Sequence, residues 1–211
     1  GNILGYAQLL KGGVAGDATL AGYADIIATQ SQRASRVVQD LLAYARKDTC
    51  SAETCDVNTV VRELVDAFIH CRLQRYGIDM RLELDAEPVM AEGSCGEIDI
   101  VVTNVLANAI HAVTGTPDPR IVVTTWRDGA NVAIAVADNG PGVAEPERGR
   151  LFDPFYTTKS VGQGTGLGLF ISQAMVTRRG GLIELDAVHA PGARFVIHLP
   201  AVHTEPACAA A

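Results

Sequence analysis

Basic side chains are scarce in this 211-residue sequence, where 17 lysines and arginines stand against 24 aspartates and glutamates, for a formal net charge of −7. A nucleic-acid surface needs a basic stripe, and an anionic membrane attracts basic segments. We therefore expect no nucleic acid among the partners and no membrane contact in this chain. A nucleotide requires only local positive charge, so the composition leaves nucleotide binding open.

Long apolar runs are also missing. No run approaches the roughly 18 residues of a membrane-spanning helix, and no basic segment followed by an apolar one opens the chain. Hydrophobic residues nevertheless make up 48% of the sequence, which is enough for a packed core. We expect a cytoplasmic location, while the full-length protein could be anchored in a membrane.

Cysteines are few, odd in number and scattered. They are Cys50, Cys55, Cys71, Cys95 and Cys208. Cys50 and Cys55 have no matching second pair of ligands, which disfavours a zinc site. We expect reduced structural thiols in a reducing compartment.

Histidine is absent from residues 1–47, where apolar positions recur at three- and four-residue steps. This spacing predicts helices over 1–11 and 18–47, joined by a short loop. A hairpin this thin cannot bury its apolar stripe alone. We expect residues 1–48 to form a hairpin domain that makes a homodimer, with packing against the rest of the same chain as the alternative.

The rest of the sequence predicts a second domain over residues 56–200, after a polar linker and before a small, apolar tail over 201–211. The overall class is α+β. Helical periodicity covers 56–76, 97–113 and 169–179, and strand patterns cover 78–84, 121–126, 132–137, 182–188 and 193–199. Asp128 and Gly129 mark a hairpin turn between the second and third of these strands.

Three polar residues stand out in the apolar helix predicted over 97–113. Asn104 and Asn108 are one turn apart and point the same way. An asparagine carbonyl oxygen suits Mg²⁺, which keeps water and phosphate oxygens as its other ligands, and a buried asparagine satisfied by backbone groups is the alternative. His111 is either structural or directed toward a phosphate.

A carboxylate and two glycines follow the strand predicted over 132–137. Asp138 could accept a hydrogen bond from an exocyclic amine, which would select adenine over guanine. Alternatively, it could simply stabilise its turn. Gly140 and Gly142 would permit a tight turn beneath a base.

A second glycine-rich segment follows a loop that ends in Lys159. Glycines at 164, 166 and 168 let backbone N–H groups approach an anion, and the helix that begins there adds a favourable dipole. Lys159 could pair with a terminal phosphate, or remain a solvated lysine. The glycine run is not embedded in a strand–loop–helix unit with a downstream ribose acid, which disfavours a dinucleotide fold.

Together these segments resemble the N, G1, F and G2 boxes of sensor histidine kinases, in the family order. The matching residues are 104–112, 138–142, 151–155 with 157–159, and 164–169. The F box with its threonines and lysine separates the sequence from related ATPases such as MutL and gyrase B. The resemblance implies a Bergerat (GHKL-type) fold, an α/β sandwich whose mixed sheet carries helices on one face, with a lid over roughly residues 144–164.

The resemblance also implies roles for individual residues. Asn108 would coordinate Mg²⁺, Asn104 would support the triphosphate, and Asp138 would recognise the adenine amine, while Gly140 and Gly142 would shape the base pocket. The other ATP-binding candidates are His111, Thr157, Thr158, Lys159, Gly164, Thr165, Gly166, Leu167, Gly168 and Leu169.

Three features depart from the family pattern. The hairpin matches only the end of the family's first helix and lacks the phosphoacceptor histidine and its acidic neighbour, so we expect the acceptor before Gly1 and no autophosphorylation by this chain alone. His111 stands where many members have a basic residue. The segment over residues 192–195 lacks the frequent threonine, which removes support for a water-mediated base contact.

The sequence is therefore interpreted as the ATP–Mg²⁺-binding core of a sensor histidine kinase, which passes the γ-phosphoryl group to a histidine and then to the receiver domain of a response regulator. One alternative is a regulatory module without kinase activity, which binds a nucleotide or merely a partner through the same fold. Another is a GHKL ATPase, which would need an acid in the Asn-box helix to activate water. Glu97 is poorly placed for that, about three turns from Asn108.

Overall fold

The computed structural model describes residues 2–13, 17–45, 53–68, 76–159, 164–186 and 191–202. They belong to two compact units, residues 1–47 with 153–168 and residues 48–152 with 169–211, and each is described by itself. Within the described ranges, no helix is both long enough and apolar enough to cross a membrane. Expectations for Cys50, Cys71 and Cys208 and for most of the tail fall outside these ranges.

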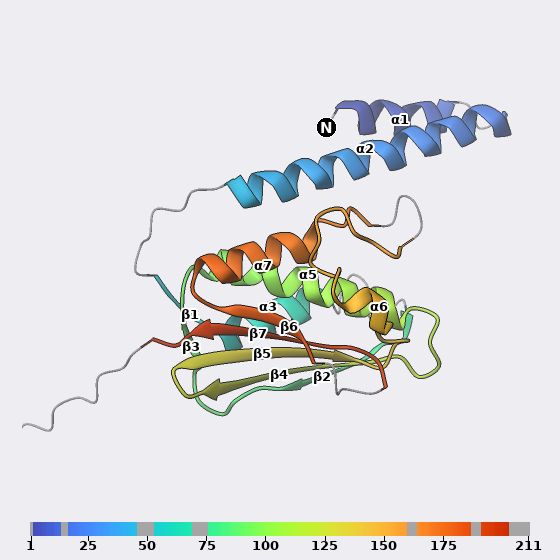
Figure 1. Cartoon of the computed structure of the whole chain (residues 1–211). Helices are drawn as coiled ribbons and strands as arrows, with labels where there is room; N and C mark the ends of the chain where they lie inside the picture. The colour runs from blue at the N-terminus through green and yellow to red at the C-terminus, as the bar shows by residue number, and fades with distance from the viewer. Residues whose placement is uncertain are drawn as a thin grey trace, which may run out of the picture. The chain divides into compact units, whose positions relative to one another are not determined.

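The first unit contains a helical hairpin of α1 (Asn2–Gly13) and α2 (Ala18–Ala45) (Figure 1). Asp17 begins α2, because its Oδ1 accepts the backbone N–H groups of Thr19 at 2.9 Å and Leu20 at 3.1 Å. The helices pack on each other, yet large apolar side chains on both stay exposed, among them Ile3, Tyr6, Leu9, Tyr23 and Ile26.

The second unit is built on a five-stranded mixed sheet. Its order is β2 (Asp79–Glu83), β4 (Arg120–Asp128), β5 (Asn131–Asp138), β7 (Arg194–Pro200) and β6 (Leu182–Leu185). β2 and β4 are parallel, whereas the other neighbouring strands are antiparallel. A separate antiparallel pair joins β1 (Thr54–Asp56) to β3 (Met90–Glu92).

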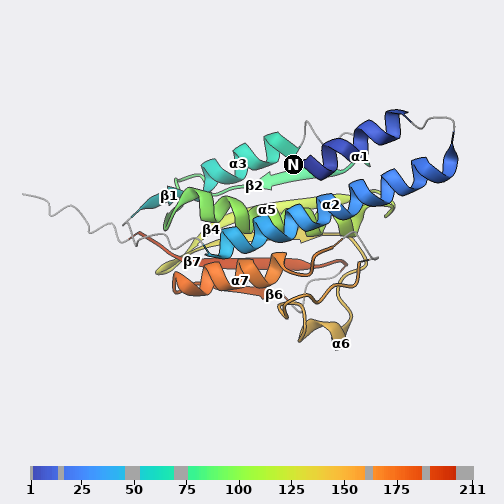
Figure 2. The same cartoon turned by 90° about the horizontal axis from the view of Figure 1, so that it is seen from above.

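Three helices cover one face of the five-stranded sheet, as Figures 1 and 2 show. They are α3 (Val57–Phe68), α5 (Cys95–Val113) and α7 (Gly168–Arg178), and a shorter helix, α6 (Glu145–Arg148), follows the end of β5. In β4 alternate residues are buried, as a period of two requires, among them Ile121 and Val123, whereas β5 buries the consecutive residues 132–136. The predicted α+β class, with helices on one face of a mixed sheet, is confirmed.

A buried polar network ties α3 to the sheet. Thr125 on β4 donates its hydroxyl to Asn58 Oδ1 and accepts the backbone N–H of Asp85 at 3.1 Å. Asn58 Nδ2 donates to the carbonyl oxygens of Asp85 at 3.1 Å and Glu87 at 3.0 Å. Asn58 and Thr125 are each only 2% exposed. The network therefore fixes the 85–87 segment between α3 and β4.

Cys55 and Cys95 form a disulfide, with 5.2 Å between their Cα atoms. The expectation of reduced thiols is wrong for this pair. Cys55 lies in β1, in a stretch assigned to the linker from sequence, and Cys95 is the first residue of α5. The pairing carries no sequence signal because 40 residues separate the two cysteines, and only the folding of β1 and α5 against each other brings them together.

Candidate functional site

Asp138 ends β5 with a buried carboxylate, 5% exposed. Its Oδ1 accepts the backbone N–H of Gly140 at 2.8 Å and that of Ala193 at 3.3 Å, and its own backbone N–H donates to the Ala193 carbonyl at 2.8 Å. Such bonds stabilise the ionised form of a buried carboxylate. The structure thus aims one oriented acceptor group into the turn that leaves β5.

Three glycines, Gly140, Gly142 and Gly192, lie where this turn leaves no room for a side chain. A Cβ on Gly140 would lie 2.9 Å from the Ala112 carbonyl oxygen, and a Cβ on Gly142 would lie 2.8 Å from the Gly192 carbonyl oxygen. At Gly192 a methyl group would overlap the carbonyl oxygen of Asp138. Gly142 and Gly192 also have φ values of 74° and 94°, which favour glycine. The turn over residues 138–142 is therefore packed backbone to backbone against the segment before β7.

Asn104, Asn108 and His111 all lie on α5. The two asparagines are half-buried and one turn apart, as predicted, whereas His111 is exposed in the last turn. Asn104 Nδ2 donates to the hydroxyl of Ser172 on α7 at 3.1 Å, and Ser172 is fully buried. Asn104 thus contacts α7, and the C-terminal turn of α5 that carries His111 touches the Gly140 turn through Ala112.

Most of the F- and G2-box segments, residues 153–159 and 164–168, belong to the other compact unit. Phe155 donates its backbone N–H to the Gly166 carbonyl at 2.9 Å, so the two segments are joined. Gly164 passes Thr157 and Lys159 so closely that a Cβ there would lie 2.7 Å from Thr157 Oγ1. Thr158 is exposed, and residues 160–163 fall between the described ranges.

Phe155 and Lys159, both in the F-box segment, have unusual environments. Phe155 has φ 65° and its side chain is 70% exposed. Burial lowers the pKa of Lys159 from its usual value, because a charged ammonium is poorly solvated there. Thr165 Oγ1 accepts the Leu167 N–H at 3.3 Å, and Gly168 and Leu169 open α7.

The family described as histidine kinase-, DNA gyrase B-, and HSP90-like ATPase matches residues 96–203, just over half of the chain. The chain belongs to this family. It is 32% identical over 200 residues to Sporulation kinase E of Bacillus subtilis (strain 168), covering 93% of this chain and 26% of that protein. It is also 32% identical over 183 residues to the sensor histidine kinase ZraS of Escherichia coli O157:H7, covering 84% and 38%.

A solved structure of the histidine kinase ThkA in complex with the response regulator protein TrrA matches with a TM-score of 0.72 and 26% identity, covering 94% of this chain and 56% of that chain. The resemblance to sensor histidine kinases seen in the four sequence boxes is confirmed. The chain spans about a quarter to two fifths of the length of the two curated relatives.

The sequence did not predict the contacts that Gly192, Ala193 and Asn139 make around the turn over residues 138–142. Gly192 and Ala193 were noted only as part of a strand pair and of the 192–195 segment that lacks a threonine, although they contact Asp138 directly. Asn139 was passed over between Asp138 and Gly140, although its side chain makes two hydrogen bonds to backbone groups. The Pro191–Gly192 turn was visible in the sequence, but its position against Asp138 depends on strand pairing.

Proposed function

We propose that this chain is the ATP-binding catalytic core of a sensor histidine kinase. The observation that carries the proposal is the buried carboxylate of Asp138, held by the backbone N–H groups of Gly140 and Ala193 beside a glycine-containing turn. A carboxylate oxygen can accept more than one hydrogen bond. In this proposal Asp138 accepts a hydrogen bond from the exocyclic amine of adenine, and the glycines leave room for the flat base.

The residues present fit ATP with Mg²⁺. Asn108 offers an amide oxygen for the metal, and Asn104, whose Nδ2 donates to Ser172, supports the triphosphate side of α5. When bound, ATP supplies the γ-phosphoryl group, and Mg²⁺ neutralises charge on its phosphates. The backbone N–H groups of residues 164–169 bind phosphate oxygens, and Lys159, Thr157 and Thr158 add polar contacts.

Lys159 gives this proposal an electrostatic rationale. Burial lowers its pKa, because the charged ammonium is poorly solvated there. A phosphate beside it restores favourable interactions for the charged form and raises its pKa again. His111, exposed on the last turn of α5, is a further phosphate candidate.

The alternative of a GHKL ATPase is less well supported. Glu97, the acid available in the first turn of α5, pairs with Arg178 and Arg179. It also lies roughly 16 Å along the helix from Asn108, at 1.5 Å per residue. An acid committed to two arginines at the far end of the helix is poorly suited to activating a water beside a phosphate.

We infer that the hairpin makes a homodimer and that a response-regulator receiver domain is the phosphate's final acceptor. The exposed apolar side chains of α1 and α2 support the first inference, and the kinase–regulator complex among the similar structures supports the second. Residues 1–47 contain no histidine, so this chain alone does not autophosphorylate on its hairpin. A cytoplasmic location suits ATP chemistry.

Calorimetric titration with ATP, with and without Mg²⁺, tests the nucleotide proposal. We expect binding by the wild-type chain, a loss of affinity of at least tenfold in Asp138→Asn, and a loss of the Mg²⁺ dependence in Asn108→Ala. His198→Ala, a substitution on β7 outside the candidate site, is the control and should bind normally. A wild-type chain without ATP affinity would favour the regulatory module, and steady hydrolysis without a phosphorylated protein would favour the ATPase.

A further inference from the structure

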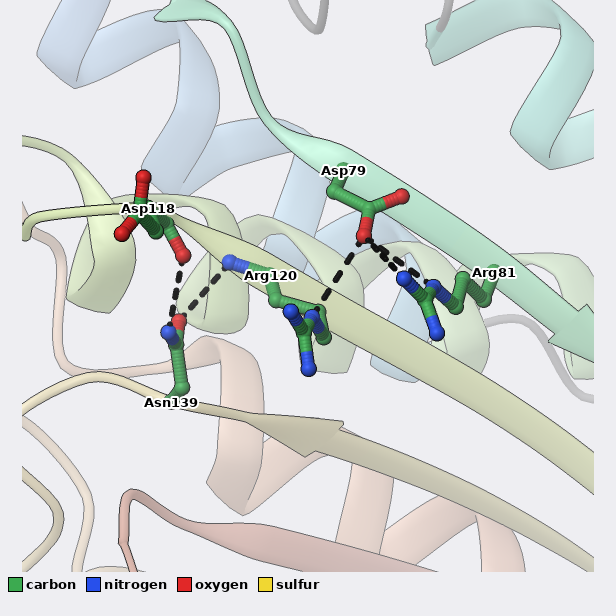
Figure 3. Close-up of polar contacts among 5 residues, drawn as sticks. All are labelled: Asp79, Arg81, Asp118, Arg120 and Asn139. Atoms are coloured by element: carbon green, nitrogen blue, oxygen red, sulfur yellow. Dashed lines mark hydrogen bonds and ion pairs between the residues drawn. The ribbon is translucent and has the colours of Figure 1, made fainter.

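Asn139 follows the Asp138 carboxylate directly, and its side chain reaches out of the turn to a neighbouring segment (Figure 3). Its Oδ1 accepts the backbone N–H of Arg120 at 2.7 Å, and its Nδ2 donates to the carbonyl oxygen of Asp118 at 2.9 Å. Its backbone N–H also donates to the Arg120 carbonyl at 3.2 Å. We propose that Asn139 is a positioning residue, which sets the place of Asp138 relative to α5 and thereby the recognition of the adenine amine.

Residues 118–120, to which the Asn139 side chain is hydrogen-bonded, are themselves held in place. Asp118 has φ 47°, an uncommon backbone conformation for a residue other than glycine. The carbonyl of Pro119 accepts the Asp79 backbone N–H at 2.8 Å. The Arg120 side chain lies 3.4 Å from Asp79 Oδ2, which Arg81 also contacts at 2.9 Å (Figure 3). These ion pairs are exposed and contribute little stability, but with the backbone bond they fix the segment on β2.

The same segment continues α5. Thr114 donates its hydroxyl to the Ile110 carbonyl at 2.7 Å, and Thr116 donates its backbone N–H to the Val113 carbonyl at 3.0 Å, so the chain leaves the helix in a defined direction. On its other side the turn touches α5 directly, because Gly140 packs on the Ala112 carbonyl. Asn139 and Gly140 together therefore hold the turn against the end of the helix that carries Asn108.

Only an asparagine-like side chain can make both bonds from this position. The pair requires one acceptor and one donor on the same short side chain, which an amide supplies and a carboxylate or an alkyl group does not. Without the Asn139 side chain, the bonds from Gly140 and Ala193 still hold Asp138 in its turn. The turn then keeps only the backbone bond from residue 139 to the Arg120 carbonyl as its anchor on residues 118–120, and the carboxylate loses alignment toward the amine.

The inference rests on the proposed nucleotide function, and inosine diphosphate provides a selective probe. It carries an oxygen where adenosine diphosphate carries the exocyclic amine, so it keeps the phosphate contacts and lacks the bond to Asp138. A positioning role predicts that loss of Asn139 weakens binding of adenosine diphosphate and leaves binding of inosine diphosphate nearly unchanged. A merely structural role weakens both nucleotides equally.

The experiment is a calorimetric titration of both diphosphates into the wild-type chain, Asn139→Ala and Asn139→Asp. Asn131→Ala, the same change at the opposite end of β5, is the matched control. We expect the wild type and Asn131→Ala to prefer adenosine diphosphate, and Asn139→Ala to lose about tenfold of that preference, the size of one hydrogen bond to a charged group. Asn139→Asp keeps the size and the acceptor of the side chain but not the donor, and should also reduce the preference.

An unchanged preference in both Asn139 variants, or an equal loss for both nucleotides, would overturn the positioning role. Thermal unfolding of each variant checks that it folds, and the isosteric Asn139→Asp remains informative if the alanine variant does not. A wild-type chain that binds neither diphosphate would instead contradict the proposed function. A wild type that binds both equally would contradict the role of Asp138 and, with it, that of Asn139.

Discussion

Arg179 donates through Nε to Glu97 Oε2 at 2.8 Å and joins the residue after α7 to the first turn of α5. Arg178 pairs with the other carboxylate oxygen, and only 10% of the Glu97 side chain is exposed. The two helices that carry Asn104 and Ser172 are therefore held together at two points, by that amide–hydroxyl bond and by this ion pair. Because the pair is largely buried, removing its charge has a measurable cost.

Replacing Glu97 with glutamine should lower the free energy of unfolding by about 2 kcal/mol, since a neutral amide makes weaker bonds to two guanidinium groups. Urea unfolding followed by circular dichroism measures the change. Glu145→Gln, on the exposed surface of α6, is the control and should change stability by less than about 0.5 kcal/mol. Equal stability of Glu97→Gln and the wild type would mean that the ion pair contributes nothing to the contact between α5 and α7.

Reduction of the Cys55–Cys95 disulfide should lower stability by about 3–4 kcal/mol, because the bond closes a long loop and restricts the unfolded chain. The melting temperature with and without dithiothreitol measures this difference. The double variant Cys55→Ser with Cys95→Ser should not respond to the reductant. If the wild type melts at the same temperature in both conditions, then either the bond does not form in solution or its loop is already constrained.

Thr125→Val should destabilise the protein by roughly 2–3 kcal/mol, because valine keeps the volume but leaves Asn58 Oδ1 and the Asp85 N–H without their bonds in the core. Thr124→Val is the matched control on the other side of the same strand, where the residue is half-buried. Urea midpoints of the two variants should separate clearly. Similar midpoints would show that the network can be replaced by apolar packing.

Asp99→Asn should stabilise the protein at neutral pH. Partial burial and then the negative charge of Glu63 raise the pKa of Asp99 above its usual 3.8. Above that raised pKa the folded state carries an unfavourable charge, which the variant removes. Below about pH 3.8 the carboxyl is protonated in both states, and the advantage disappears.

Urea unfolding of Asp99→Asn from pH 3 to pH 7 follows this trend. Glu63→Gln relieves only the second of the two causes, so its gain at pH 7 should be smaller. A gain that stayed constant down to pH 3 would exclude the carboxylate charge as its origin.

The placement of the candidate residues could be predicted from sequence where it depends on local structure. Asn104 and Asn108 are one helical turn apart, and Asp138 stands two residues before Gly140, so residue types and spacing sufficed to place them. Gly192 and Asn139 were missed because their contacts cross between segments. Asn139 meets Asp118 and Arg120, which lie about twenty residues earlier, only after β4 and β5 pair.

The same reasoning applies to the fold. Long periodic segments such as α5 and β5 were predicted within a few residues. β1 and β3 have three residues each and show no period, so residues 54 and 55 were assigned to the linker. The disulfide depends on the placement of β1, and an error in one short strand therefore carried over into the prediction for two cysteines.

The contact between Gly192 and the Asp138 turn also bears on how the protein folds. About fifty residues separate these segments in the sequence, and they meet only when β7 has paired with β5. Contacts between residues so distant in the chain form late, because closing a long loop costs entropy. A partly folded chain in which β4 and β5 are already paired would still lack the contact between Gly192 and the Asp138 turn. Bound nucleotide would then act as a reporter of the last strand-pairing step, appearing in refolding experiments after helix formation is complete.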